Sequence, residues 1–101
     1  MKVNVKQKDI DEGVQGSENS CALALAVRRA FNTHNVYVHY IGEDGHFSRL
    51  RIKVDNEYYS HSHIDKAEHC DNFIDWFDNG MLGEDGCEPF KFEIDTSRTT
   101  I

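Results

Sequence analysis

The chain has 101 residues, 39% of them hydrophobic and 11% aromatic, and 18 acidic against 11 basic residues give a formal net charge of −7. This length predicts one domain, which we place at residues 1–96 with a flexible tail at 97–101, and the composition excludes a disordered chain. The charge disfavours direct binding to nucleic acid and favours basic partners. No run of 18 apolar residues predicts a transmembrane helix, so we expect no membrane partner.

The first third of the chain predicts a short strand and a helix. Residues 2–6 alternate polar and apolar, as in a strand with one face in water. Residues 8–13 fit a single helical turn that ends in glycine. Asn19 or Ser20 is then expected to cap a helix that runs to about Asn32. Its apolar side carries Leu23, Ala26, Val27, Ala30 and Phe31.

The middle of the chain predicts a hairpin. Residues 36–41 and 49–54 both alternate, and the intervening Gly-Glu-Asp-Gly at 42–45 is typical of a turn. The outward positions of the second strand are basic, at Arg49, Arg51 and Lys53. Residues 58–61 fit a short edge strand.

The last third predicts a second helix and a final strand. The helix is expected over 65–79, with Gly80 placed to end it, and its buried side carries Ala67, Cys70, Phe73, Ile74 and Phe77. Residues 90–94 alternate as a strand after Pro89. The order β-α-β-β-(β)-α-β predicts an α+β fold with two helices packed on a small, mostly antiparallel sheet of four to five strands. The pattern allows the two terminal strands to lie side by side.

The cysteines and the N-terminus bear on the compartment. Three widely spaced cysteines are an odd number, which argues against a disulfide scaffold and for a reducing cytoplasm. The N-terminal residues lack the continuous apolar stretch of a signal peptide.

One cysteine stands where a polar loop enters a helix, the position in which thiol enzymes present a nucleophile. The segment from Gln15 to Cys21, Gln-Gly-Ser-x-x-Ser-Cys, resembles the start of the papain-like cysteine proteases. This resemblance implies Cys21 as the nucleophile and Gln15 as an oxyanion donor. His39 or His46 is then the candidate base and Asp55 the residue that orients it. A small thiol hydrolase is therefore one alternative, and a cysteine that only packs at a helix start is the other.

A histidine cluster before the second helix offers a metal-binding alternative. His61 and His63 lie two residues apart, and His69 and Cys70 follow within the helix. Imidazole and thiolate groups are the ligands that zinc prefers. A solvated, histidine-rich turn explains the same residues without a metal.

An acidic stripe runs along the second predicted helix. Its members recur every three or four residues, which places them on one face: Asp65, Glu68, Asp71, Asp75 and Asp78. Trp76 falls towards this polar side and is a candidate anchor for a partner. The stripe fits a basic groove on another protein, and an ordinary solvated helix face is the alternative.

Four segments of the chain are similar to a group of small, uncharacterised proteins of tailed bacteriophages. They are Ile10-Asp-Glu-Gly13, Cys21-Ala-Leu-Ala-Leu-Ala26, Phe73-Ile-Asp-Trp-Phe-Asp-Asn-Gly80 and Pro89-Phe-Lys-Phe92. The chain has Ala22 where that group tends to have Pro. The resemblance implies a phage origin, a bacterial host cytoplasm and no particular activity.

The leading expectation is a non-enzymatic phage accessory protein without a cofactor. It would bind a host or phage macromolecule through the acidic stripe, and a basic nucleic-acid-binding protein of host defence is the expected partner class. The thiol-hydrolase and metal-binding readings remain as alternatives.

Overall fold

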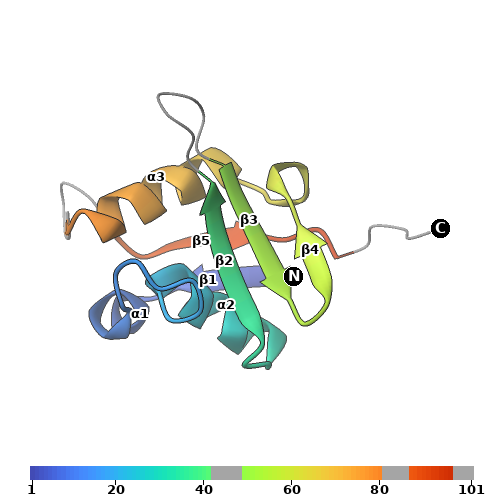
Figure 1. The fold of residues 1–101 in the computed structure, drawn as a ribbon, viewed down its shortest axis with the longest axis horizontal. Coiled ribbons are helices and arrows are strands. Elements are labelled where there is room, and N and C mark those ends of the chain that lie inside the picture. Colours follow the sequence, from blue (N-terminus) through green and yellow to red (C-terminus); the bar gives the residue numbers. More distant parts are fainter. Residues whose placement is uncertain (42–48, 81–86, 97–101) are drawn as a thin grey trace.

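The computed structural model describes residues 1–41, 49–80 and 87–96, and its elements form an α+β fold. In chain order they are β1 (Lys2–Val5), α1 (Gln7–Glu12), α2 (Ala22–Phe31), β2 (Val36–Ile41), β3 (Arg49–Val54), β4 (Glu57–Tyr59), the 3₁₀ turn η1 (His61–His63), α3 (Ala67–Asp78) and β5 (Phe90–Glu93) (Figure 1). His46 and the predicted tail at 97–101 lie outside the described residues. Within those residues, no helix has the length and apolar character needed to cross a membrane.

The strands form two separate antiparallel sheets, so the prediction of one sheet of four to five strands is wrong. The terminal strands β1 and β5 pair with each other, with Val3 opposite Phe92. The other sheet has the order β2-β3-β4, and Val38 lies opposite Ile52. The side-by-side arrangement of the terminal strands is therefore confirmed, but they do not join the central hairpin.

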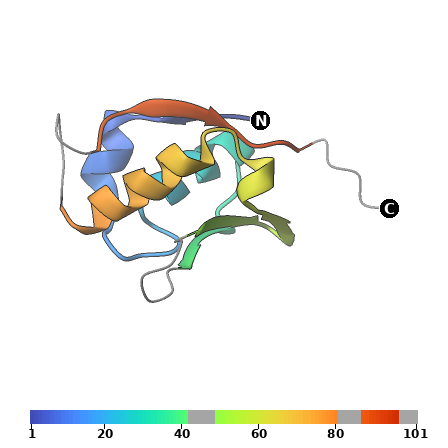
Figure 2. The ribbon, with the colours of Figure 1, turned by 90° about the horizontal axis from the view of Figure 1, so that it is seen from above.

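Helix α2 explains why there are two sheets. It contacts β1 on one side and β2 on the other, and Figure 2 shows α2 and α3 between the two sheets. A helix in that position must be apolar over most of its circumference. Five of its ten residues are buried: Ala22, Leu23, Ala24, Ala26 and Val27. The small alanines let both sheets approach the helix closely, and the terminal strands cover the side that the central sheet cannot reach.

The helix boundaries differ from the sequence prediction at two places. The N-cap of α2 is Cys21, not Asn19 or Ser20, and its sulfur accepts a hydrogen bond from the Ala24 amide at 3.5 Å. The hydroxyl of Ser17 accepts from the Ser20 amide, so these polar residues close the loop on itself before the helix starts. Helix α3 begins at Ala67, after Lys66 takes a left-handed conformation with φ of 60°.

The core lies between the layers and contains the positions that periodicity predicted for α3. All five predicted residues of that helix are buried: Ala67, Cys70, Phe73, Ile74 and Phe77. One charged side chain, Asp9, is buried with them among the described residues. Its carboxylate accepts hydrogen bonds from both Nη atoms of Arg29, at 2.8 and 2.7 Å, and this ion pair fixes α1 against α2.

Candidate functional site

The Cys21 thiol is buried, and its sulfur accepts a hydrogen bond from a backbone amide of α2. Its side chain serves as the cap of α2, and the residue is only 7% exposed. Burial raises the pKa of the Cys21 thiol, and the amides at the start of the helix, which lower it, do not compensate. A nucleophilic cysteine needs the opposite shift, because the thiolate is the reactive form.

The other residues of the thiol-hydrolase reading do not gather around Cys21. The side-chain amide of Gln15 donates to the backbone carbonyl of Phe77 at 2.8 Å. His39 stacks beside Tyr37 at 6.3 Å between ring centroids, on the face of β2 opposite to the buried Val38. Asp55 accepts a hydrogen bond from Thr33 at the far end of that strand. The described geometry therefore offers Cys21 neither a base nor an oxyanion donor.

A small cleft does border Cys21. Its volume is about 190 Å³, and its lining includes Gly16, Val38, Ile74 and Asp78. Ligand pockets of enzymes typically measure about 300–1,000 Å³. Asp78 adds a negative charge that further raises the pKa of the thiol. The cleft is thus smaller than a typical ligand pocket, and its charge opposes formation of the Cys21 thiolate.

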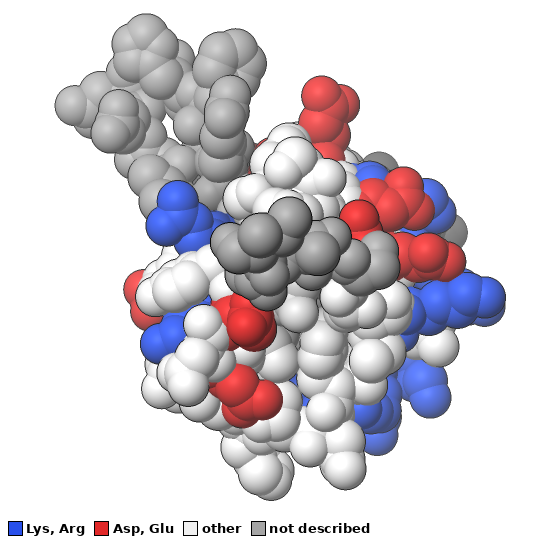
Figure 3. Space-filling view, turned by 90° about the vertical axis from the view of Figure 1, so that its right-hand side faces the viewer, with Lys and Arg blue, Asp and Glu red and all other residues white. Residues whose placement is uncertain are grey.

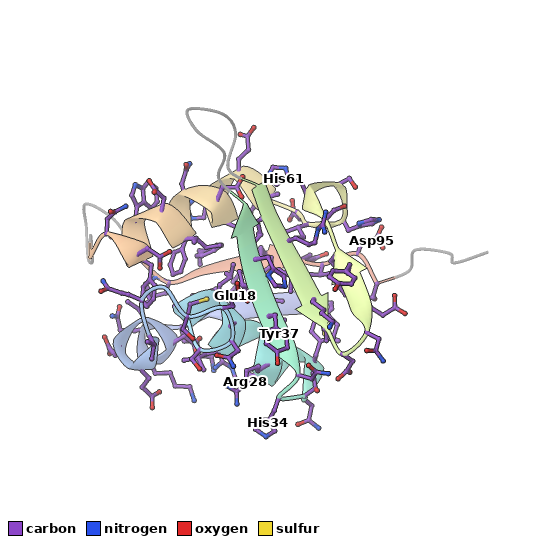
Figure 4. The ribbon with its side chains drawn as sticks, in the orientation of Figure 1. Glu18, Arg28, His34, Tyr37, His61 and Asp95 are labelled. Atoms are coloured by element: carbon purple, nitrogen blue, oxygen red, sulfur yellow. The ribbon has the colours of Figure 1, made fainter. Side chains whose placement is uncertain are left out.

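The three histidines of the metal reading have three different environments. Nε2 of His61 lies 2.6 Å from a carboxylate oxygen of Asp71, beside the start of α3 (Figure 4). Nδ1 of His63 pairs with the hydroxyl of Ser60 at 3.1 Å. His69 packs its ring edge against Phe90, with centroids 4.5 Å apart. The described residues contain no group of three His, Cys, Asp or Glu side chains arranged to hold a metal ion.

The acidic stripe on α3 divides into two parts. With about 100° of rotation per residue, Asp71 and Asp78 lie on the flank that faces β3 and the 14–20 loop. Asp71 accepts from the Leu50 amide at 3.0 Å as well as pairing with His61, and Asp78 accepts from the Gly16 amide at 2.9 Å. These two carboxylates thus hold neighbouring parts of the fold, which the helical spacing did not predict.

The outward face of α3 retains the remaining acids. Glu68 and Asp75 are exposed and seven residues apart, with the exposed Asn72 and Asn79 between and after them. Asp65 is exposed just before the helix. None of these three acids forms an ion pair with a described residue, whereas Asp71 pairs with His61. This outward row (Asp65, Glu68, Asp75) is called the α3 acidic face below.

An aromatic cluster lies along the other flank of α3. Trp76 is half-buried and packs against the core, with the ring of His69 6.1 Å away in an edge-on arrangement. Phe90 of β5 is also half-buried and contacts both His69 and Phe73. Trp76 therefore supports its neighbours and still presents part of its ring to solvent beside the α3 acidic face.

The second sheet has a solvent-facing side that the sequence only partly revealed. Tyr37, Lys53 and Tyr58 lie directly opposite one another on β2, β3 and β4. The Lys53 ammonium lies 5.8 Å from the centre of the Tyr37 ring and 5.6 Å from that of Tyr58. Arg51 lies 5.8 Å from the Tyr58 ring. The basic hairpin face was predicted, but the alignment of rings and cations depends on strand register.

This sheet surface (Tyr37, His39, Arg51, Lys53, Tyr58) is called the sheet-face patch. Its outward positions, where the structure describes the side chains, carry no acid; Glu18 approaches His39 from the adjoining loop at 3.6 Å. Figure 4 shows Tyr37 on the side of the sheet opposite to the helices, and Figure 2 shows no described helix or strand over that side. Figure 3 shows Lys and Arg at both lateral edges of this view, with Asp and Glu among them.

No protein-family model, curated protein or solved structure matches this chain. The candidate sites therefore depend on their own geometry: an engaged thiol, three separate histidines, the α3 acidic face and the sheet-face patch.

Proposed function

We propose that this chain is a non-enzymatic binding protein that recognises a basic protein through the α3 acidic face. The setting we propose is that of a bacteriophage accessory protein in the cytoplasm of the bacterial host. A nucleic-acid-binding protein of host defence is the proposed partner class, because its basic groove would complement a row of carboxylates.

The observation that carries the proposal is that Asp65, Glu68 and Asp75 are exposed and form no ion pair with a described residue; Asp75 accepts one hydrogen bond, from the exposed Asn79 at 3.3 Å. Acids that serve the fold are engaged in this structure: Asp9 with Arg29, Asp71 with His61, and Asp78 with the Gly16 amide. None of the three outward acids holds a second element of the fold in this way. They are therefore available to the cations of a partner at no cost to the fold.

Trp76 gives this face a second feature of a binding surface. Protein interfaces concentrate their binding energy in a few residues, of which Trp is the most enriched, surrounded by polar residues that exclude water. Trp76 is held by His69 and by the core, so little side-chain entropy remains to be lost on binding.

The test is a tagged capture from nuclease-treated bacterial lysate with paired charge-reversal variants. Glu68→Lys with Asp75→Lys changes the net charge by about +4 and alters only exposed side chains. The matched control is Asp11→Lys with Glu12→Lys, which makes the same change on the exposed side of α1. We expect the α3 double variant to lose a basic partner that the wild type and the α1 variant retain. Equal retention by all three proteins would show that the α3 acidic face is not the binding surface.

A further inference from the structure

The sheet-face patch combines the two chemical groups that single-stranded nucleic acid requires. Sequence-tolerant binding of single strands uses aromatic rings on which bases stack and cations that follow the phosphates. Tyr37 and Tyr58 supply rings on the outer strands of the sheet, and Lys53 lies between them. Arg51 stands next to this row on the same strand as Lys53. From these positions we propose that the sheet-face patch is a binding site for a short single-stranded nucleic acid.

The spacing of the row suits more than one base. Neighbouring strands are about 4.8 Å apart, so Tyr37 and Tyr58 are separated by two strand widths, roughly 10 Å. Separate bases can therefore stack on the two rings, while Lys53 reaches a phosphate between them. Tyr58 is 47% exposed and Tyr37 is half-buried, so both side chains lie partly in solvent, beside the cations that a bound strand would share with them.

Single-stranded nucleic acid fits the patch better than an acidic protein does. An acidic peptide would use Arg51 and Lys53 but would gain little from two tyrosine rings held flanking a cation. Each base of a single strand has a flat face for a ring and an adjoining phosphate for a cation. A duplex conceals its base faces, so the rings would find no partner there.

The net charge of −7 does not prevent this contact. Charges further away than the Debye length, about 8–10 Å at physiological salt, are largely screened from a bound strand. Within the patch, the described outward positions carry Arg51 and Lys53 and no acid, and the Glu18 carboxylate stands at its edge, 3.6 Å from His39. The site is separate from the α3 acidic face, and the inference does not depend on that face binding a protein.

The experiment is a fluorescence-anisotropy titration of a labelled oligothymidylate of twelve nucleotides with the whole chain. Lys53→Gln removes the central cation, and Lys2→Gln is its matched control on β1, which belongs to the other sheet. Tyr37→Ala removes a ring, and Tyr37→Phe restores it without the hydroxyl. Arg51→Gln provides a second cation variant at an exposed position. Circular dichroism confirms that each variant is folded.

We expect saturable binding that Tyr37→Ala weakens by at least about fivefold and Tyr37→Phe preserves. Lys53→Gln and Arg51→Gln each weaken it, while Lys2→Gln does not. With two phosphate contacts, the logarithm of the association constant falls with the logarithm of salt concentration with a slope of about −1.4. No saturable binding at low salt overturns the proposal. It is also overturned if Lys2→Gln costs as much as Lys53→Gln, or if polyglutamate displaces the oligonucleotide at equal charge concentration.

Discussion

The buried pair of Asp9 and Arg29 gives the sharpest prediction about stability. Asp9 is 2% exposed, and its carboxylate accepts from both Nη atoms of Arg29 and from the Lys6 amide at 2.8 Å. Arg29 also donates to the carbonyl of Asn4 at 2.7 Å, so one guanidinium joins β1, α1 and α2. Removing it leaves a buried carboxylate without its counter-charge.

The magnitude follows from burial. Breaking a buried ion pair by removing one partner costs about 3–5 kcal/mol. The Arg29 side chain is 34% exposed, so solvent reduces the effect, and we expect Arg29→Met to lower the free energy of unfolding by about 2–3 kcal/mol. The total free energy of unfolding of a typical domain is about 5–15 kcal/mol, so this loss is a large part of it.

The pH dependence has a definite sign. Burial alone raises the pKa of Asp9, but the hydrogen bonds from Arg29 and the Lys6 amide, together with the charge of Arg29, outweigh burial and hold this pKa below its usual value. A folded pKa below the unfolded value of about 3.9 means that the contribution to stability is complete above that pH. It is lost as the pH falls through the folded pKa.

Urea unfolding monitored by circular dichroism at pH 7 and at acid pH measures both effects. Arg28→Met is the matched control, because Arg28 lies on the same helix and the only described hydrogen bond of its side chain is with the exposed His34 at 2.7 Å. We expect this control to cost less than about 0.5 kcal/mol. A loss below about 0.5 kcal/mol for Arg29→Met would refute the claim that this pair stabilises the fold.

Four further predictions concern the buried thiols, the packing of the helices and one partly buried hydrogen bond. Burial raises the pKa of the Cys70 thiol to about 12 and that of the Cys87 thiol to about 11. Because the unfolded thiols lose their protons at about pH 8.5, each cysteine should lower the free energy of unfolding by about 1.4 kcal/mol per pH unit as the pH rises from 8.5 towards its folded pKa. A free energy of unfolding that does not change between about pH 8.5 and 10 would contradict this. All three thiols should react with iodoacetamide at pH 7.5 only as fast as the chain unfolds, and rapid labelling of one cysteine would restore the enzyme reading. Gly13→Ala should lower the free energy of unfolding in urea by about 1–3 kcal/mol, because an added Cβ would lie 2.7 Å from the amide nitrogen of Ala22. An unchanged free energy would mean that the end of α1 moves away from the start of α2 easily. Asp71→Ala should lower the free energy of unfolding by about 1–3 kcal/mol, because the Leu50 amide loses its acceptor. Asp75→Ala, at an exposed position, should lower it by less than about 0.5 kcal/mol. Equal losses for the two variants would argue against the division of the acidic stripe.

Much of the local structure could be predicted from sequence periodicity. The five buried positions of α3 follow from apolar residues recurring every three or four places, and the hairpin of β2 and β3 follows from two alternating runs joined by turn residues. These signals are local, because each element presents one apolar side to the core. The α+β class follows directly from them.

The arrangement of the elements could not be predicted in the same way. Whether the terminal strands join the central sheet depends on which sides of α2 are covered, and a run rich in alanine is compatible with one sheet or two. The small residues Ala22, Ala24 and Ala26 were the available signal, since they permit close approach from both sides.

The candidate sites divide along the same line. Helical spacing placed five acids on one side of α3. However, Asp71 and Asp78 accept hydrogen bonds from backbone amides of β3 and of the 14–20 loop, which lie far away in the sequence. The sheet-face patch depends on register, which a one-residue slip would destroy. Its signal was the alternation of Arg51 and Lys53 with buried residues on β3, opposite the outward Tyr37 of β2.

The central claim is that the α3 acidic face contacts a basic protein, and carboxyl footprinting of the captured complex tests it most directly. Carbodiimide labelling read by mass spectrometry reports the accessibility of each Asp and Glu side chain. We expect Asp65, Glu68 and Asp75 to lose labelling in the complex, while Asp11 and Glu12 on α1 keep it. Unchanged labelling of the three α3-face acids, with protection elsewhere, would contradict the proposed binding surface.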